Sequence, residues 1–253
     1  MLAHERTGSG PPLMLLHGLG SCKEMWRPVM PLLAREHEVI VVDLPGFGES
    51  PSGAETVDGM ADELSAFADE LGLNSFHVAG NSMGGGLALA LGARGRVASA
   101  CAISPIGFAN DREAAYARAV LTLTRALSVA GAPVAELLCG TRALRTVNFS
   151  HLVGRGWRLP REEAALWVRK CAVCPGFWPL LRSAPSWDVE TPVVPTTVAW
   201  GDRDRLLIYS RQAPRARRVL PGARHVTLTG CGHVPTWDDP EAVARVIVES
   251  AGA

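Results

Sequence analysis

The segment Gly80-Asn81-Ser82-Met83-Gly84 decides how this chain is interpreted, because it joins an apolar run at residues 76–79 to a run of small residues at 85–90. The apolar run favours a buried strand, and the small residues favour a helix that packs closely against it. The flanking glycines leave room for a tight, strained turn around Ser82. This is the strand, turn and helix context of a G-x-S-x-G nucleophile motif, in which the start of the helix directs its free N–H groups at the reacting oxygen.

A serine hydroxyl becomes a good nucleophile only when a base takes its proton and an acid orients that base. The order along the chain expected for this motif is serine, acid, histidine. His233 lies in a glycine-rich loop at residues 229–235, directly after an apolar run at 225–228. His225 lies within that run, and His17 precedes Gly18, where it is expected to brace a loop. We therefore predict His233 as the base.

The acid is expected after the apolar run at residues 193–200, which leads into Gly201-Asp202-Arg203-Asp204. Open α/β sheets place their functional groups in loops at the carboxyl ends of strands. Asp202 and Asp204 are both candidates at this point, because an aspartate beside a glycine can equally serve a turn.

The rest of the chain alternates short apolar runs with helical patterns, which predicts an α/β fold with a mostly parallel sheet and helices on both faces. The runs are nearly continuous in hydrophobicity, as in strands buried on both sides. The further expected strands are residues 13–16, 39–42 and 97–103, and the expected helices are 55–71, 84–92, 205–219 and 240–249.

Residues 104–192 break this alternation, because they contain no convincing strand. Helical patterns occur at 112–129 and 160–173. We interpret 104–192 as a helical lid inserted between two strands of one sheet, so that residues 1–103 and 193–253 form the two parts of a single α/β core.

Composition limits the possible partners of the chain. Its 253 residues suit one principal core, and 25 basic residues balance 25 acidic ones. This gives no footprint for nucleic acid, so we expect a small-molecule partner. The N-terminus lacks a secretory pattern, and no later apolar run approaches the roughly 18 residues of a membrane span, so we expect a cytoplasmic protein without a membrane partner.

No cofactor or metal is expected from the motifs. The segment Gly18-Leu19-Gly20-Ser21-Cys22-Lys23 lacks the third glycine of a dinucleotide fingerprint, and no phosphate-binding G-x4-G-K-[ST] loop occurs in the chain. Cys171 and Cys174 form a single CxxC pair, which suits packing on a helix better than redox or zinc chemistry. The six cysteines fit reduced thiols.

Taken together, the motifs resemble the α/β-hydrolase superfamily, in its serine-nucleophile branch with a helical lid. They are His17-Gly18-Leu19-Gly20, the segment from Asp43 to Ser50, Gly80 to Gly84, Gly201 to Asp204, and Gly232-His233 followed by Asp239-Pro240. The resemblance selects Asp204, the last residue of a G-x-x-D turn, as the acid. It also implies an oxyanion hole formed by the backbone N–H groups of Leu19 and Met83. One departure is that the first strand of the usual eight-stranded sheet looks missing or reduced.

The resemblance also guides the expected reaction. Relatives that open epoxides or displace halide use aspartate at the position of Ser82, so the serine favours acyl transfer. We expect hydrolysis of an ester, lactone or thioester of a small, largely apolar substrate, with Trp26, Asn81 and Trp237 as substrate contacts. The alternatives are carbon–carbon bond hydrolysis of ketonic acids, a non-hydrolytic biosynthetic enzyme, and a ligand-binding protein. Bulk in the lid is expected from Phe108, Tyr116, Trp157, Trp167, Phe177, Trp178 and Trp187.

Overall fold

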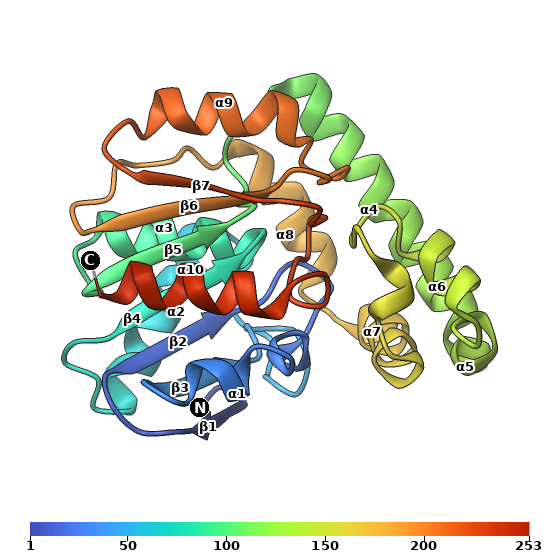
Figure 1. Ribbon diagram of the computed structural model, residues 1–253, viewed down its shortest axis with the longest axis horizontal. Helices are drawn as coiled ribbons and strands as arrows, with labels where there is room; N and C mark the ends of the chain where they lie inside the picture. The colour runs from blue at the N-terminus through green and yellow to red at the C-terminus, as the bar shows by residue number, and fades with distance from the viewer. Residues whose placement is uncertain (253) are drawn as a thin grey trace.

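The computed structural model describes residues 1–252 of the chain, apart from the side chain of Ser186. One sheet runs through the molecule in the strand order β1-β3-β2-β4-β5-β6-β7 (Figure 1). All neighbouring strands are parallel except β1 and β3. The α/β fold expected from the sequence is confirmed. The strands are β1 (His4–Thr7), β2 (Pro12–Leu16), β3 (Glu38–Val42), β4 (His77–Asn81), β5 (Ser99–Ile103), β6 (Thr196–Gly201) and β7 (Arg224–Leu228).

The first strand, β1, was not among the expected elements. It forms the edge of the sheet, where His4 pairs with Val42 in an antiparallel register. Its side chains are polar and mostly exposed, and Arg6 forms an ion pair with Glu38 at 2.7 Å. Such an edge strand needs no buried face, so it leaves no alternating apolar pattern in the sequence. Within residues 1–252 the sheet has seven strands. This is one fewer than the eight that are usual in the family it resembles, as the sequence suggested.

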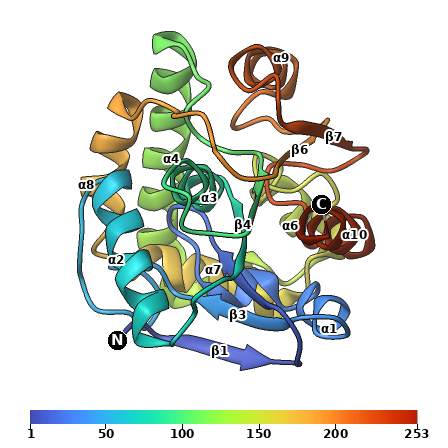
Figure 2. The same ribbon diagram turned by 90° about the vertical axis from the view of Figure 1, so that its left-hand side faces the viewer.

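Helices cover both faces of the sheet, because successive strand residues point to opposite sides. Met14 and Leu16 pack with α2 and α3, whereas Leu13 and Leu15 pack with α1 and α10. Figure 2 shows these pairs of helices on opposite sides of the strands. The core helices are α1 (Met30–Leu33), α2 (Val57–Glu70), α3 (Met83–Ala93), α9 (Tyr209–Val219) and α10 (Pro240–Ala251), and a 3-10 helix η1 (Lys23–Trp26) precedes α1.

The regular elements between β5 and β6 are all helices within the described residues. This segment lies beyond the end of the sheet toward which β2 points, on the right of Figure 1. The long helices match the expected ones, and the shorter helices were missed because a few residues give no usable periodicity. The elements are α4 (Asp111–Gly131), η2 (Ala132–Val134), α5 (Ala135–Leu138), α6 (Arg142–Asn148), η3 (Gly156–Arg158), α7 (Arg161–Val173), α8 (Phe177–Ser183) and η4 (Ala184–Ser186).

Helices α4, η2 and α5 together form a longer apolar stretch than the sequence pattern predicted. Asp111–Leu138 is long and apolar enough, by length and composition alone, to cross a membrane. However, Leu121, Thr124 and Ser128 of α4 line a cavity inside the protein. We therefore treat this stretch as part of the folded domain and assign it no bilayer role.

Candidate active site

The turn at Ser82 has the strained backbone that the sequence predicted. Ser82 lies between β4 and α3 with φ 58° and ψ −114°, outside the regions that side-chain-bearing residues favour. A Cβ on Gly80 would lie 2.0 Å from the carbonyl oxygen of Gly84, and a Cβ on Gly84 would lie 2.2 Å from that of Leu16. Gly80 thus allows β4 to approach α3 closely, and Gly84 allows α3 to approach the end of β2.

The predicted base and the predicted acid meet. Nδ1 of His233 lies 2.8 Å from Oδ2 of Asp204, and both side chains are almost completely buried. The loop that carries the imidazole packs on the end of β6, since a Cβ on Gly201 would lie 2.2 Å from the carbonyl oxygen of Gly232. Two glycine-containing loops far apart in sequence therefore bring this pair together.

The structure separates the two aspartates that the sequence left as candidates. Asp204 accepts further hydrogen bonds from Trp200 Nε1 at 3.1 Å and from the amides of Leu206 and Leu207, each at 2.9 Å. This is the environment of an ionised carboxylate, which only accepts hydrogen bonds. Asp202 instead accepts a hydrogen bond from the amide of Gly230 at 2.7 Å. Only Asp204 contacts the histidine, and Asp202 stabilises a turn.

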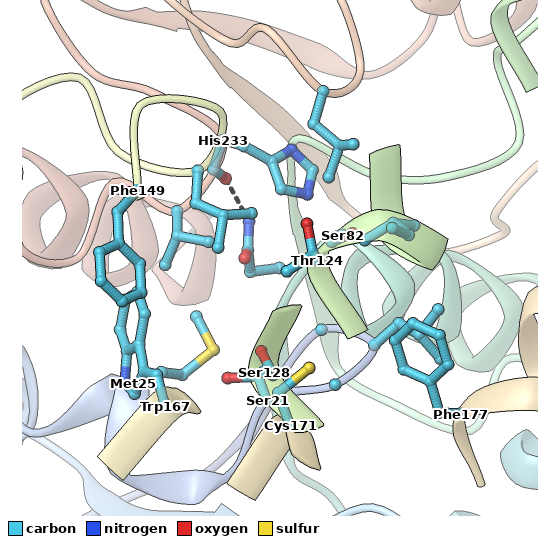
Figure 3. A pocket seen from close by; sticks show the side chains of 18 of the residues that line it. Ser21, Met25, Ser82, Thr124, Ser128, Phe149, Trp167, Cys171, Phe177 and His233 are labelled. Carbon is cyan, nitrogen blue, oxygen red and sulfur yellow. Dashed lines mark hydrogen bonds between the residues drawn. The ribbon is translucent and has the colours of Figure 1, made fainter. Parts of the chain in front are cut away.

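Ser82 and His233 line the same cavity, which has a volume of about 80 Å³ and is otherwise mostly apolar (Figure 3). Its lining comes from the core loops, from α4, α7 and α8, and from Phe149 and Leu152 between α6 and η3. Within residues 1–252, no hydrogen bond joins the Ser82 hydroxyl to the imidazole. Such bonds are often loose in unliganded enzymes and tighten when substrate binds.

The predicted oxyanion-hole amides are free to bind a ligand. Neither the Leu19 amide nor the Met83 amide donates a hydrogen bond within the described part of the chain. Met83 is the first residue of α3, so its N–H lies at the positive end of that helix. The loop that carries Leu19 approaches Ser82 closely, since a Cβ on Gly18 would lie 3.7 Å from Ser82 Oγ.

His17 braces this loop, as the sequence reading expected. Its Nδ1 donates to the carbonyl of Gly18 at 2.8 Å, and its Nε2 accepts from the amide of Leu44 at 3.0 Å. The second bond requires an unprotonated Nε2, so the ring is neutral. Burial lowers the pKa of His17, which favours the same state. This histidine therefore holds the loop and is not available as a base.

Of the three predicted substrate contacts, Asn81 lies at the cavity, whereas Trp26 and Trp237 pack in the core. Asn81 lines the cavity, but its Nδ2 also donates to the carbonyl of His233 at 2.8 Å and to that of Ile103 at 3.1 Å. Trp26 is completely buried in the core, and Trp237 packs against the same core cluster. The structure thus brings Asn81 to the site, but it does not bring either tryptophan into a cavity beside Ser82.

Asp238 holds the loop that carries His233 in place. The sequence did not single out this residue. Its Oδ2 accepts from the amides of Gly232 at 2.7 Å and Gly154 at 2.8 Å, and its Oδ1 accepts from the amide of Arg155 at 2.7 Å. Burial raises the pKa of this carboxyl, and the three amides oppose that rise. Asp238 therefore connects the His233 loop to the helical segment. The sequence offered only the run Asp238-Asp239-Pro240, in which Asp239 caps α10.

The aromatic residues expected to supply bulk in the helical segment divide into three groups, and Phe149, which was not among them, also lines the cavity beside Ser82. Trp167 and Phe177 line the cavity shown in Figure 3. Phe108 is buried in a core cluster beside Trp200. The others lie at the surface or at a second cavity: Tyr116, Trp157 and Trp178 are substantially exposed, and Trp187 lines the second cavity.

The two cysteines of the CxxC pair pack near the end of α7. Both are buried free thiols, and Cys174 Sγ donates to the carbonyl of Cys171 at 3.3 Å. Among the described residues, no group of three or more His, Cys, Asp or Glu side chains is arranged to hold a metal ion.

Together, the doubly covered sheet and the strained serine turn are those of an α/β hydrolase. A model of the alpha/beta hydrolase family matches residues 13–246, and the chain belongs to that family.

Individual relatives differ in how much of their length they share with this chain. It is 29% identical over 276 residues to the pimeloyl-acyl-carrier-protein methyl ester esterase of Aeromonas hydrophila, covering 98% of each chain. It is 29% identical over 238 residues to the dihydrolipoyllysine-residue acetyltransferase component of the acetoin cleaving system from Cupriavidus necator, covering 91% of this chain but only 61% of that one. Among solved structures, a thermophilic esterase from Thermogutta terrifontis has 26% identity and a TM-score of 0.71, with 98% of this chain and 92% of that chain covered. The relatives named as esterases support a hydrolase.

Proposed function

We propose that the protein is a serine hydrolase that cleaves a carboxylic ester, lactone or thioester of a small, largely apolar substrate. The observation that carries this proposal is that Ser82 and His233 line one cavity, that Asp204 is hydrogen bonded to His233, and that two free backbone amides lie beside the serine. The esterase names of the relatives support the same class of reaction.

In the proposed mechanism, His233 removes the proton from Ser82 as the serine oxygen attacks the substrate carbonyl. The negative charge that develops on the carbonyl oxygen is stabilised by the amides of Leu19 and Met83. Asp204 keeps the imidazole in the orientation needed and stabilises the imidazolium. His233 then protonates the leaving group. A water molecule, deprotonated by His233, releases the acid from the acyl-enzyme.

The helical segment above the cavity is proposed to act as a lid that excludes water and selects the substrate. The cavity in Figure 3 is lined by no residue with a permanent charge. The carboxylate of a ketonic acid would find no cationic partner in this cavity, which costs free energy. This favours neutral acyl compounds over the carbon–carbon cleavage alternative.

The test is the hydrolysis of short p-nitrophenyl esters by the wild type and by Ser82→Ala. We expect steady release of p-nitrophenol by the wild type and a loss of at least about 10⁴-fold in kcat for the variant. Comparable turnover by the two proteins would show that Ser82 is not the nucleophile.

A further inference from the structure

A second cavity adjoins Ser82 and is larger than the first, at about 150 Å³. It shares Leu19, Ser82, Leu121 and Leu206 with the first cavity. The nucleophile therefore lies where two cavities meet. An ester has an acyl arm and an alcohol arm on either side of the bond that breaks, so each cavity can hold one arm.

The two cavities differ in their unpaired polar groups: within residues 1–252, the first has single unpaired atoms, Asn81 Oδ1 and Trp167 Nε1, whereas the second has a whole carboxamide. Gln212 of α9 lines the second cavity and is 1% exposed. Neither its Oε1 nor its Nε2 has a hydrogen-bond partner within the described residues. Gln212 follows shortly after Leu206 and Leu207, whose amides bind Asp204 and whose side chains line the same cavity. The carboxamide thus lies in the helix that follows the turn of the predicted catalytic acid.

An unpaired buried carboxamide is unfavourable for folding. Each unsatisfied polar group costs roughly 1–3 kcal/mol, and native proteins pair nearly all of them. The surroundings do not require a polar residue, because Gln212 lies in α9 beside Ala213 and Ala216, which pack in an apolar cluster. A methionine or leucine would fill this place without the penalty. Groups that destabilise the free protein in this way commonly have their partner in a ligand.

We propose that Gln212 determines specificity by hydrogen bonding to a neutral polar group in one arm of the substrate. A carboxamide offers both a donor and an acceptor, which suits an amide, a ketone or a hydroxyl. The charged residues that line the second cavity are Arg118 and Asp188, both exposed and of opposite sign, so the cavity favours no net charge. The substrate class is therefore an uncharged acyl compound in which the arm held by the second cavity carries such a group. This inference rests on the proposed hydrolase function.

The experiment uses three esters of equal length. One is apolar in both arms, one carries an internal amide in the acyl arm, and one carries it in the alcohol arm. We expect the wild type to prefer one of the two amide esters. Gln212→Met should lower kcat/KM for that ester by about tenfold or more, because a site built for a hydrogen bond discriminates strongly. The same variant should leave kcat/KM for the apolar ester unchanged or higher. Equal losses on all three esters, or no loss on either amide ester, would overturn the proposal.

A stability measurement separates this role from a structural one. If the carboxamide lacks a partner inside the fold, Gln212→Met and Gln212→Leu should unfold at the same temperature as the wild type or higher. A clear drop in Tm for both variants would show that Gln212 stabilises the fold, and this would contradict the proposal.

Fluorophosphonate labelling distinguishes failure of this inference from failure of the proposed function. Labelled Ser82 without discrimination between the esters would overturn the role of Gln212 alone. Unlabelled Ser82 together with no hydrolysis of any of the three esters would overturn the hydrolase assignment, and the role of Gln212 with it.

Discussion

The end of the sheet and the helical segment above it are built in opposite ways. At the end of the sheet, the side chains of Asp204 and His17 are buried, and both form hydrogen bonds with neighbouring groups. In the helical segment, large apolar side chains are exposed instead, and Leu127, Leu137 and Val147 are 62%, 72% and 71% exposed. The comparison teaches that the end of the sheet is constrained by backbone geometry and paired polar groups, whereas the helical segment that lines the first cavity is under far fewer constraints.

The largest expected effect tests the sheet side of this comparison. Asp204→Asn should lower kcat by about 10³- to 10⁴-fold, because an amide cannot hold the imidazole in the required tautomer. Asp202→Asn is the matched control, since that side chain serves only the turn at Gly230. Its kcat should stay near the wild-type value. The assignment of the acid would be wrong if the two variants exchanged these results.

The next effect concerns the contact between the two regions. Asp238→Asn places an NH₂ group against amide donors, so it should displace the His233 loop. We expect up to about a 100-fold loss in kcat and a loss of about 1–3 kcal/mol in the free energy of unfolding, measured by ester hydrolysis and urea titration. Asp239→Asn is the control, because asparagine caps a helix as well as aspartate does. Identical behaviour of the two variants would contradict a special role for Asp238.

The smallest expected effect lies within the helical segment. His151 accepts or donates a hydrogen bond with Thr124 at 3.0 Å, and its burial, together with the nearby His233, lowers its pKa from 6.5 to about 4. The unfolded chain therefore binds a proton more readily than the folded protein does. This residue stabilises the fold above pH 6.5, and that contribution is lost as the pH falls toward 4.

At pH 5 the loss from His151 amounts to about 2 kcal/mol relative to pH 7. Urea unfolding at the two pH values should show a smaller pH dependence for His151→Gln than for the wild type. An equal pH dependence for the two proteins would mean that this histidine does not titrate as described.

Much of the fold could be predicted from the sequence, because buried parallel strands leave continuous apolar runs. The serine turn could be predicted for a related reason, since only glycine is tolerated at positions 80 and 84. Strand β1 could not, because an exposed edge strand leaves no such pattern. Asp238 could not either, since its partners Gly154 and Arg155 lie 84 and 83 residues away. Trp26 shows the same limit, because a tryptophan near a functional loop packs equally well into the core.

The most direct test of the central claim is labelling with a fluorophosphonate, followed by mass spectrometry of the peptides. The account predicts a single adduct on Ser82, formed rapidly by the wild type and much more slowly by His233→Ala. An active wild-type protein with no adduct on Ser82, or with its adduct on another residue, would contradict it.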